Sequence, residues 1–219
     1  MSGQATRTES KIFCIGAGKT GTTSLESFFR ALGFRVGDQA AGELLLHAWA
    51  VRDFAPIIAL AESAQFFQDI PFSCPFTFQA MDIAFPSSKF ILSVRDDPEQ
   101  WFGSVIRFHT QIIGKGRLPT AGDLKEFPYR HKGWLWEALE VVYGVAEEEP
   151  YRKDFLIDWY IRHNDEAKRY FAHRGESLLV VNVSDRTAPQ QLMEFVGLTY
   201  NGEQMPHLNR TSDTAPSSL

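Results

Sequence analysis

The hydrophobic positions of the chain alternate between short continuous runs and helix-like repeats. Residues 11–16 carry four consecutive apolar side chains, a pattern typical of a strand buried on both faces. In residues 22–32 the apolar side chains recur every three or four positions, and Gly33 follows where helices commonly end. The beginning of the chain is therefore predicted to form a strand, a turn and a helix.

The same alternation continues to the end of the chain. We expect further strands at residues 65–70, 89–95 and 177–183, and helices at residues 43–53, 76–85, 98–108, 151–171 and 188–196. Residues 114–128 are rich in Gly, Pro and charge, which predicts a long surface excursion. Strands that alternate with helices predict an α/β fold with a central, mainly parallel sheet and helices on both faces.

Length and composition limit the domain organisation and the function of the chain. A length of 219 residues favours a single domain spanning 1–219, with residues 1–10 and 211–219 expected as flexible tails. The net charge of -5 gives no general attraction for nucleic acid or anionic membranes. Because no apolar run reaches the length of a membrane span or a secretory signal, we expect a cytoplasmic protein. Cys14 and Cys74 lack metal-binding spacing and are expected to be buried free thiols.

The most informative segment is the Gly/Thr-rich turn at residues 16–24, which reads GAGKTGTTS. Backbone N–H groups at a helix start converge on an anion, glycines let the backbone approach it, and Lys19 adds a positive charge. The residues expected to bind the anion are Gly18, Lys19, Thr20, Gly21, Thr22, Thr23 and Ser24. Phosphate or sulfate is the predicted ligand.

Nucleoside triphosphatases and kinases offer one interpretation of this turn. Their loop reads G-x-x-x-x-G-K-[ST], and its first glycine would fall on Phe13 inside the predicted strand. The strand at residues 89–95 ends in Arg95, where those enzymes need an acidic magnesium ligand. We therefore expect anion binding without a metal. A P-loop kinase or triphosphatase stays as the first alternative, and a non-catalytic nucleotide-binding module as the second.

Three segments resemble the PAPS-dependent sulfotransferases, in particular their short, bacterial-type members (PAPS is 3'-phosphoadenylyl sulfate). The sequence KTGTTSL is similar to their 5'-phosphosulfate loop, and residues 89–98 with Ser104 resemble their 3'-phosphate segment. Residues 178–197, followed by P-H-L-N-R at 206–210, look like their late strand, helix and terminal motif. The resemblance implies a P-loop-like sulfotransferase fold with PAPS as co-substrate, PAP (3'-phosphoadenosine 5'-phosphate) as product, and nucleotide contacts from Arg95, Ser104, Asn209 and Arg210. Arg95 and Ser104 are nine residues apart, one more than is usual in the family.

The resemblance also implies catalytic roles. Lys19 is suited to stabilise the negative charge that grows on the leaving oxygen. Asp69, at the end of the predicted strand 65–70, is our candidate general base, with a helix N-cap as its alternative role. The histidines without partner spacing, expected to be solvated or core side chains, are His47, His109, His163 and His173. The acceptor, a small molecule or a glycan that offers a hydroxyl or amine, and the oligomeric state stay open.

Overall fold

The computed structural model describes residues 10–206, which form a four-stranded sheet in the order β2-β1-β3-β4. The strands are β1 (Ile12–Cys14), β2 (Phe66–Phe67), β3 (Lys89–Ser93) and β4 (Leu178–Val181). Every neighbouring pair is parallel. The predicted α/β fold with a parallel sheet is confirmed, although each strand is shorter than its hydrophobic run suggested.

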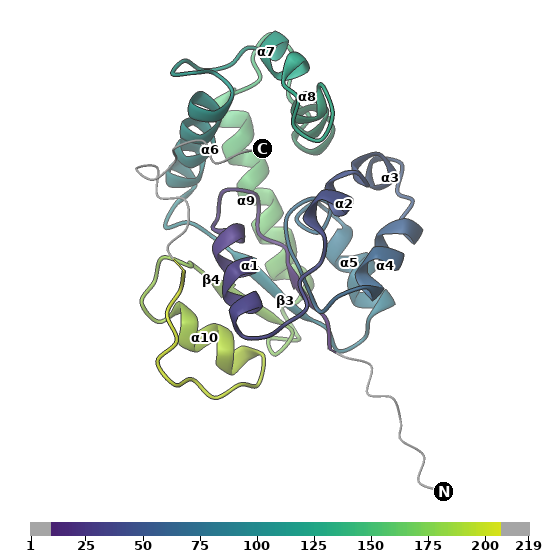
Figure 1. Ribbon diagram of the computed structural model, residues 1–219, viewed down its shortest axis with the longest axis vertical. Coiled ribbons are helices and arrows are strands. Elements are labelled where there is room, and N and C mark those ends of the chain that lie inside the picture. Colours follow the sequence, from purple (N-terminus) through teal and green to yellow (C-terminus); the bar gives the residue numbers. More distant parts are fainter. Residues whose placement is uncertain (1–9, 207–219) are drawn as a thin grey trace, which may run out of the picture.

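Helices surround the sheet (Figure 1). Those before β3 are α1 (Thr22–Ala31), α2 (Gln39–Glu43), α3 (Leu46–Ala50), α4 (Ala55–Glu62) and α5 (Thr77–Ala84). After β3 come α6 (Pro98–Ile112), α7 (Ala121–Glu126), α8 (Trp134–Ala138), the π-helical turn η1 (Leu139–Tyr143), α9 (Lys153–Tyr170) and α10 (Ala188–Phe195). Within residues 10–206, none of these helices is both long and apolar enough to cross a lipid bilayer.

The two faces of the sheet bury separate apolar clusters because successive strand residues point in opposite directions. Ile12 and Cys14 pack with side chains of α1 and α10, whereas Phe13 and Ile15 join side chains from α4, α5, α6 and α9. Figure 1 shows α1 and α10 on the near side of the sheet and α9 behind it. Phe13 is fully buried, and such a side chain contributes about 1.5–3 kcal/mol to folding. The near-continuous apolar runs of the sequence reflect this burial on both faces.

The strand order creates a switch point between β1 and β3. The chain passes from β1 to β2 on one side and then returns to β3 on the other side of β1. In sheets wound in this way, ligands bind beyond the carboxyl ends of the strands where the winding direction changes. Lys19 follows β1, Asp69 follows β2 and Arg95 follows β3, so the fold brings all three to this edge.

Three helical regions differ from the sequence-based prediction. The helix expected at residues 43–53 is shorter in the structure, where it corresponds to α3, and the preceding α2 and the following α4 were not anticipated. The predicted excursion at residues 114–128 contains α7, which begins with a capping box between Thr120 and Asp123. The sequence carries that signal, a threonine followed three residues later by an acidic side chain. The segment from α8 to η1 was also missed, and its side chains line the site described next.

Candidate functional site

Two carbonyl groups of the turn between β1 and α1 accept hydrogen bonds from side chains that lie outside the turn. The carbonyl of Gly18 accepts a hydrogen bond from Trp101 Nε1 at 2.9 Å, and that of Lys19 accepts one from Arg95 Nε at 2.8 Å. Among the described residues, no acceptor is found for six backbone N–H groups of the turn, those of Ala17, Gly18, Lys19, Gly21, Thr22 and Thr23. The turn therefore presents unpaired donors at the start of α1, where the helix dipole favours an anion.

Two glycines of the turn are required by close packing. A Cβ atom on Gly16 would collide with Ser93 of β3, and one on Gly21 would collide with the side chain of Val183. Gly21 also has φ of 99° and is the N-cap of α1, a conformation that favours glycine. These contacts hold the turn against the neighbouring strands.

Thr20 does not offer its hydroxyl to the site as expected. The side chain is fully buried, and its Oγ1 donates to the carbonyl of Ala17 at 2.7 Å and bonds to Ser93 Oγ at 2.6 Å. These contacts point the hydroxyl into the core, so Thr20 shapes the turn rather than reaching an anion. Ser24 is also buried and does not line the cavity beside the turn, whereas Gly18, Lys19, Thr22 and Thr23 do.

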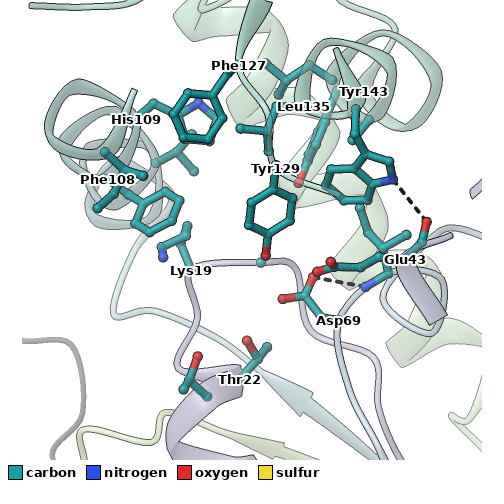
Figure 2. A pocket seen from close by; sticks show the side chains of 18 of the residues that line it. Lys19, Thr22, Glu43, Asp69, Phe108, His109, Phe127, Tyr129, Leu135 and Tyr143 are labelled. Atoms are coloured by element: carbon teal, nitrogen blue, oxygen red, sulfur yellow. Dashed lines mark hydrogen bonds between the residues drawn. The ribbon is translucent and has the colours of Figure 1, made fainter. Parts of the chain in front are cut away.

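A cavity of about 210 Å³ begins at the turn and extends between α6, α9 and the segment that runs from residue 127 to η1. Its floor is formed by the turn and by Asp69, and its walls are mainly aromatic and aliphatic. Figure 2 shows Lys19 and Asp69 on this floor, with Phe108, Phe127 and Leu135 above them. The cavity thus joins polar groups at one end to an apolar enclosure at the other.

Lys19 lies at the floor of the cavity in an unusual environment. Its Nζ is 3.4 Å from the centroid of the Phe108 ring, and its backbone has φ of 72°, which is uncommon for residues other than glycine. Burial lowers the pKa of Lys19 to about 8, the charge of Asp69 opposes this shift, and the charge of Arg95 adds to it. The ammonium is therefore poorly solvated, and a bound anion would stabilise it.

Asp69 faces the same cavity from the loop after β2. Its Oδ1 accepts a hydrogen bond from the N–H of Ile70 at 3.0 Å, and its φ of 62° is left-handed like that of Lys19. Burial raises the pKa of Asp69, against the lowering effects of the Ile70 N–H and the Lys19 charge. The helix-cap alternative is wrong for the following helix, because α5 begins at Thr77 with Phe76 as its N-cap. Strained backbone of this kind gathers at functional sites.

Glu43 is a second acidic side chain at the cavity, and the sequence analysis did not identify it. The side chain is buried and accepts hydrogen bonds from Arg130 Nε and, at 2.8 Å, from Gln39 Nε2. Burial, followed by the charge of Asp69, raises the pKa of Glu43. Burial and the Glu43 charge raise the pKa of Tyr129 to about 12, so this phenol stays protonated at neutral pH. No local pattern links Glu43 with Arg130, which follows it by 87 residues.

His109 also lines the cavity. The side chain is buried, and a core position was one of the two expectations for it. Its position at the site was not anticipated. Its Nδ1 is 2.7 Å from the hydroxyl of Tyr151, and burial, followed by the charge of Lys19, lowers its pKa to about 3. His109 is therefore neutral. The cavity-lining side chains of α6 are Trp101, Val105, Phe108, His109 and Ile112, whose spacing was a readable signal in the sequence.

A group of positive charge lies where β3 meets α6. Arg95 is partly buried, and its backbone N–H donates a hydrogen bond to the Tyr160 hydroxyl at 3.1 Å. Arg107 donates to Ser104 Oγ at 3.1 Å, and burial together with the Arg107 charge lowers the pKa of Arg95. Within the described part of the chain, Arg95 forms no ion pair with the acidic residues that follow it. Arg107 was not identified from the sequence, and its contact brings Ser104 into this basic group.

The carboxylates beside Arg95 are engaged elsewhere. Asp96 accepts hydrogen bonds from Asn182 Nδ2 and Gln100 Nε2, and Asp97 caps α6 by accepting from the backbone N–H of Gln100. The predicted start of a helix at residue 98 is confirmed. Arg95 is thereby left to contact the turn and, on its other side, the solvent.

The comparison with protein families agrees with this geometry. A family model described as a sulfotransferase domain matches residues 11–214, a range that includes the turn, Asp69 and Arg95. No curated protein matches the chain. Asn209 and Arg210, expected from the terminal motif to contact a nucleotide, lie outside residues 10–206 and their roles stay predictions. Within residues 10–206, no three His, Cys, Asp or Glu side chains are grouped so that they could hold a metal ion.

Proposed function

The chain belongs to the sulfotransferase domain family, and we propose that it transfers a sulfuryl group from PAPS to a hydroxyl or amine of an acceptor. The observation that carries this proposal is the shared cavity of Lys19 and Asp69, which opens onto the unpaired N–H groups of the turn. A cation, a carboxyl group and an anion-binding loop around one cavity are groups suited to catalyse sulfuryl transfer.

The residues present fit the two charged ends of PAPS. The unpaired N–H groups of the turn and the Lys19 ammonium suit the 5'-phosphosulfate, because donors at a helix start bind such anions. Arg95 and Arg107, with the hydroxyl of Ser104 between them in the chain, suit the 3'-phosphate. PAPS supplies an activated sulfuryl group, bound to phosphate through a bridging oxygen.

Each catalytic residue has one task in this proposal. Asp69 accepts the proton of the acceptor hydroxyl while the acceptor oxygen forms its bond to sulfur. The bond between sulfur and the bridging oxygen breaks, and its electron pair stays on the 5'-phosphate of the departing PAP. Lys19 stabilises the negative charge that develops on that oxygen. The products are a sulfate ester, PAP and protonated Asp69.

Two other side chains at the cavity, Glu43 and His109, could accept a proton. The Glu43 carboxylate is already bonded to Arg130 and Gln39, which leaves His109 as the rival base. Its low pKa makes it a weak base, and its Nδ1 is engaged with the Tyr151 hydroxyl. The raised pKa of Asp69 brings that carboxylate closer to the proton affinity that general bases need near neutral pH. The geometry therefore favours Asp69 as the base.

A P-loop kinase or triphosphatase is the alternative on a related scaffold. Those enzymes need an acidic magnesium ligand after the strand that corresponds to β3, and here β3 leads to Arg95. Thermal unfolding of the purified chain should be measured with PAP, with ATP and magnesium, and with buffer alone. A ligand present at about 100 times its Kd stabilises a protein by about 2.7 kcal/mol. We expect this stabilisation from PAP, whereas stabilisation by ATP and magnesium alone would support the alternative.

A further inference from the structure

The geometry points to the class of the acceptor: an uncharged, mostly apolar molecule of about one ring that presents a single hydroxyl, such as a small phenol. This inference rests on the proposed sulfuryl transfer and assigns the apolar end of the same cavity to the acceptor. A glycan, the other acceptor considered from the sequence, is thereby excluded. The size of the cavity, the charges around it and the hydrogen bonds of its polar groups each support this inference.

The size of the cavity limits the acceptor. Its volume is about 210 Å³, and part of this space adjoins Gly18 and Lys19, where the transferred group would lie. An apolar cavity of about 150 Å³ binds benzene, and sites for drug-sized molecules have volumes of about 300–1,000 Å³. The side chains that enclose the apolar end include Phe108, Phe127, Leu135, Leu139 and Leu156. One substituted ring fits the space that remains.

The charges at the cavity are balanced without an acceptor. The positive groups Lys19 and Arg130 face the acidic groups Asp69 and Glu43, and Arg130 is bonded directly to Glu43. With the Lys19 ammonium facing the phosphosulfate, a carboxylate on the acceptor would enter a poorly solvated space beside Asp69 and Glu43, and an ammonium group would pair with Asp69 and so engage the base. Desolvation of such a group disfavours binding, so the acceptor is expected to be neutral.

Most polar groups around the apolar end are already engaged. Trp134 Nε1 donates to the carbonyl of Glu43 at 3.1 Å, and His109 Nδ1 is paired with the hydroxyl of Tyr151. A sugar would lose water from several hydroxyl groups and find few partners, which disfavours its binding. Figure 2 shows one polar corner, where Asp69 and Glu43 lie near the hydroxyl of Tyr129. A single acceptor hydroxyl can be placed there, with the rest of the molecule against the aromatic wall.

The test uses the full chain, PAPS and a panel of acceptors matched in pairs. 4-Methylphenol represents the proposed class, 4-hydroxybenzoate and tyramine add one charge of either sign, and glucose and 2-naphthol test polarity and size. We expect kcat/KM for 4-methylphenol to exceed that of every other member by at least about 10-fold, the discrimination typical of an apolar pocket. Equal or faster transfer to glucose, tyramine or 4-hydroxybenzoate would overturn the inference.

The binding of PAP, measured by calorimetry, separates this inference from the proposed function. If PAP does not bind and no member of the panel is sulfated, the proposed function fails together with the inference. Sulfation of glucose alone, or PAP binding without transfer to 4-methylphenol, overturns the acceptor class and leaves the nucleotide assignment intact.

Two changes at Leu135 test the size limit from opposite directions. Leu135→Ala enlarges the apolar end and should shift the kcat/KM ratio towards 2-naphthol by about 10-fold, whereas Leu135→Trp fills it and should lower kcat/KM for 4-methylphenol by about as much. The matched control is Val141→Trp, since Val141 lies on η1, is 40% exposed and does not line the cavity. PAP affinity should be unchanged in all three. Identical acceptor preference in both Leu135 variants would overturn the assignment.

Discussion

The Lys19 ammonium lies over the Phe108 ring, 3.4 Å from its centroid. A cation over an aromatic face is stabilised by about 1 kcal/mol, which offsets only part of the cost of burying the charge. The pKa of Lys19 therefore falls to about 8, with burial as its main cause. The ammonium has a weak partner in Phe108 and would gain a strong one in a bound phosphosulfate.

Replacement of Lys19 by alanine should lower turnover by about 100-fold or more, because it removes a preorganised positive charge from the leaving oxygen. The affinity for PAP, which lacks the transferred group, should fall by a smaller factor than turnover does. Transfer to 4-methylphenol and calorimetry with PAP provide the two measurements. A variant that binds PAP much more weakly but turns over normally at saturation would contradict the catalytic role.

Activity should decline in alkaline solution because Lys19 must be protonated to act. The value of kcat/KM should fall as the pH rises through about 8, the pKa of Lys19 in the free protein. The negative charges of bound PAPS raise this pKa, so the fall in kcat should occur at higher pH. Lys19→Arg is the control, since arginine keeps its proton over the whole range. An alkaline limb that is the same in this variant would exclude Lys19 as its source.

Asp69→Asn should reduce kcat by about 100-fold or more, the usual contribution of a general base. The base must be deprotonated, so activity of the unmodified chain should fall as the pH decreases through the pKa of Asp69, which burial places above the ordinary aspartate range. The asparagine variant should lose this acidic limb. His109→Gln is the matched control and should change kcat by less than about 10-fold. A larger loss of kcat in His109→Gln than in Asp69→Asn would assign the base to His109.

Arg95→Ala should weaken the binding of PAP about 10- to 100-fold, because one charge-assisted contact is lost. The binding of adenosine 5'-phosphosulfate, which lacks the 3'-phosphate, should be nearly unaffected. Arg107→Ala should show the same selectivity, because its charge acts on Arg95 and its side chain holds Ser104. The control is Arg162→Ala, an exposed residue paired with Asp158 on α9. Equal losses for the two nucleotides would refute the 3'-phosphate assignment.

Arg130→Ala should destabilise the chain by about 1–3 kcal/mol, because it leaves the buried Glu43 carboxylate without its cation. The pKa of Glu43 is raised already and should rise further in the variant. A raised folded-state pKa means that stability is retained below the ordinary glutamate pKa and lost as the pH rises through the folded-state value. Chemical denaturation at several pH values should therefore show a deficit that grows with pH. A deficit independent of pH would contradict this assignment.

The alternation of strands and helices was predictable because it depends on local hydrophobic spacing. The runs that became β1 and β3, and the spacing that became α1, each reflect which faces must be buried. The helices of residues 39–62 were harder to predict, since short helices such as α2 and α3 depend on tertiary packing rather than on a long repeat. The α7 helix was missed although its capping box is visible in the sequence.

The sequence by itself determined the α/β fold and the Gly/Thr-rich turn with Lys19, because spacing and glycine content are properties of neighbouring residues. Tertiary structure alone decided that Thr20 turns its hydroxyl into the core, that Glu43 and Arg130 lie near Asp69, and that His109 lines the same cavity. Glu43 and Arg130 are 87 residues apart, and only the packing of the segment after α7 against α2 brings them together. Contacts of this kind depend on how helices pack over the sheet edge, which no local pattern encodes.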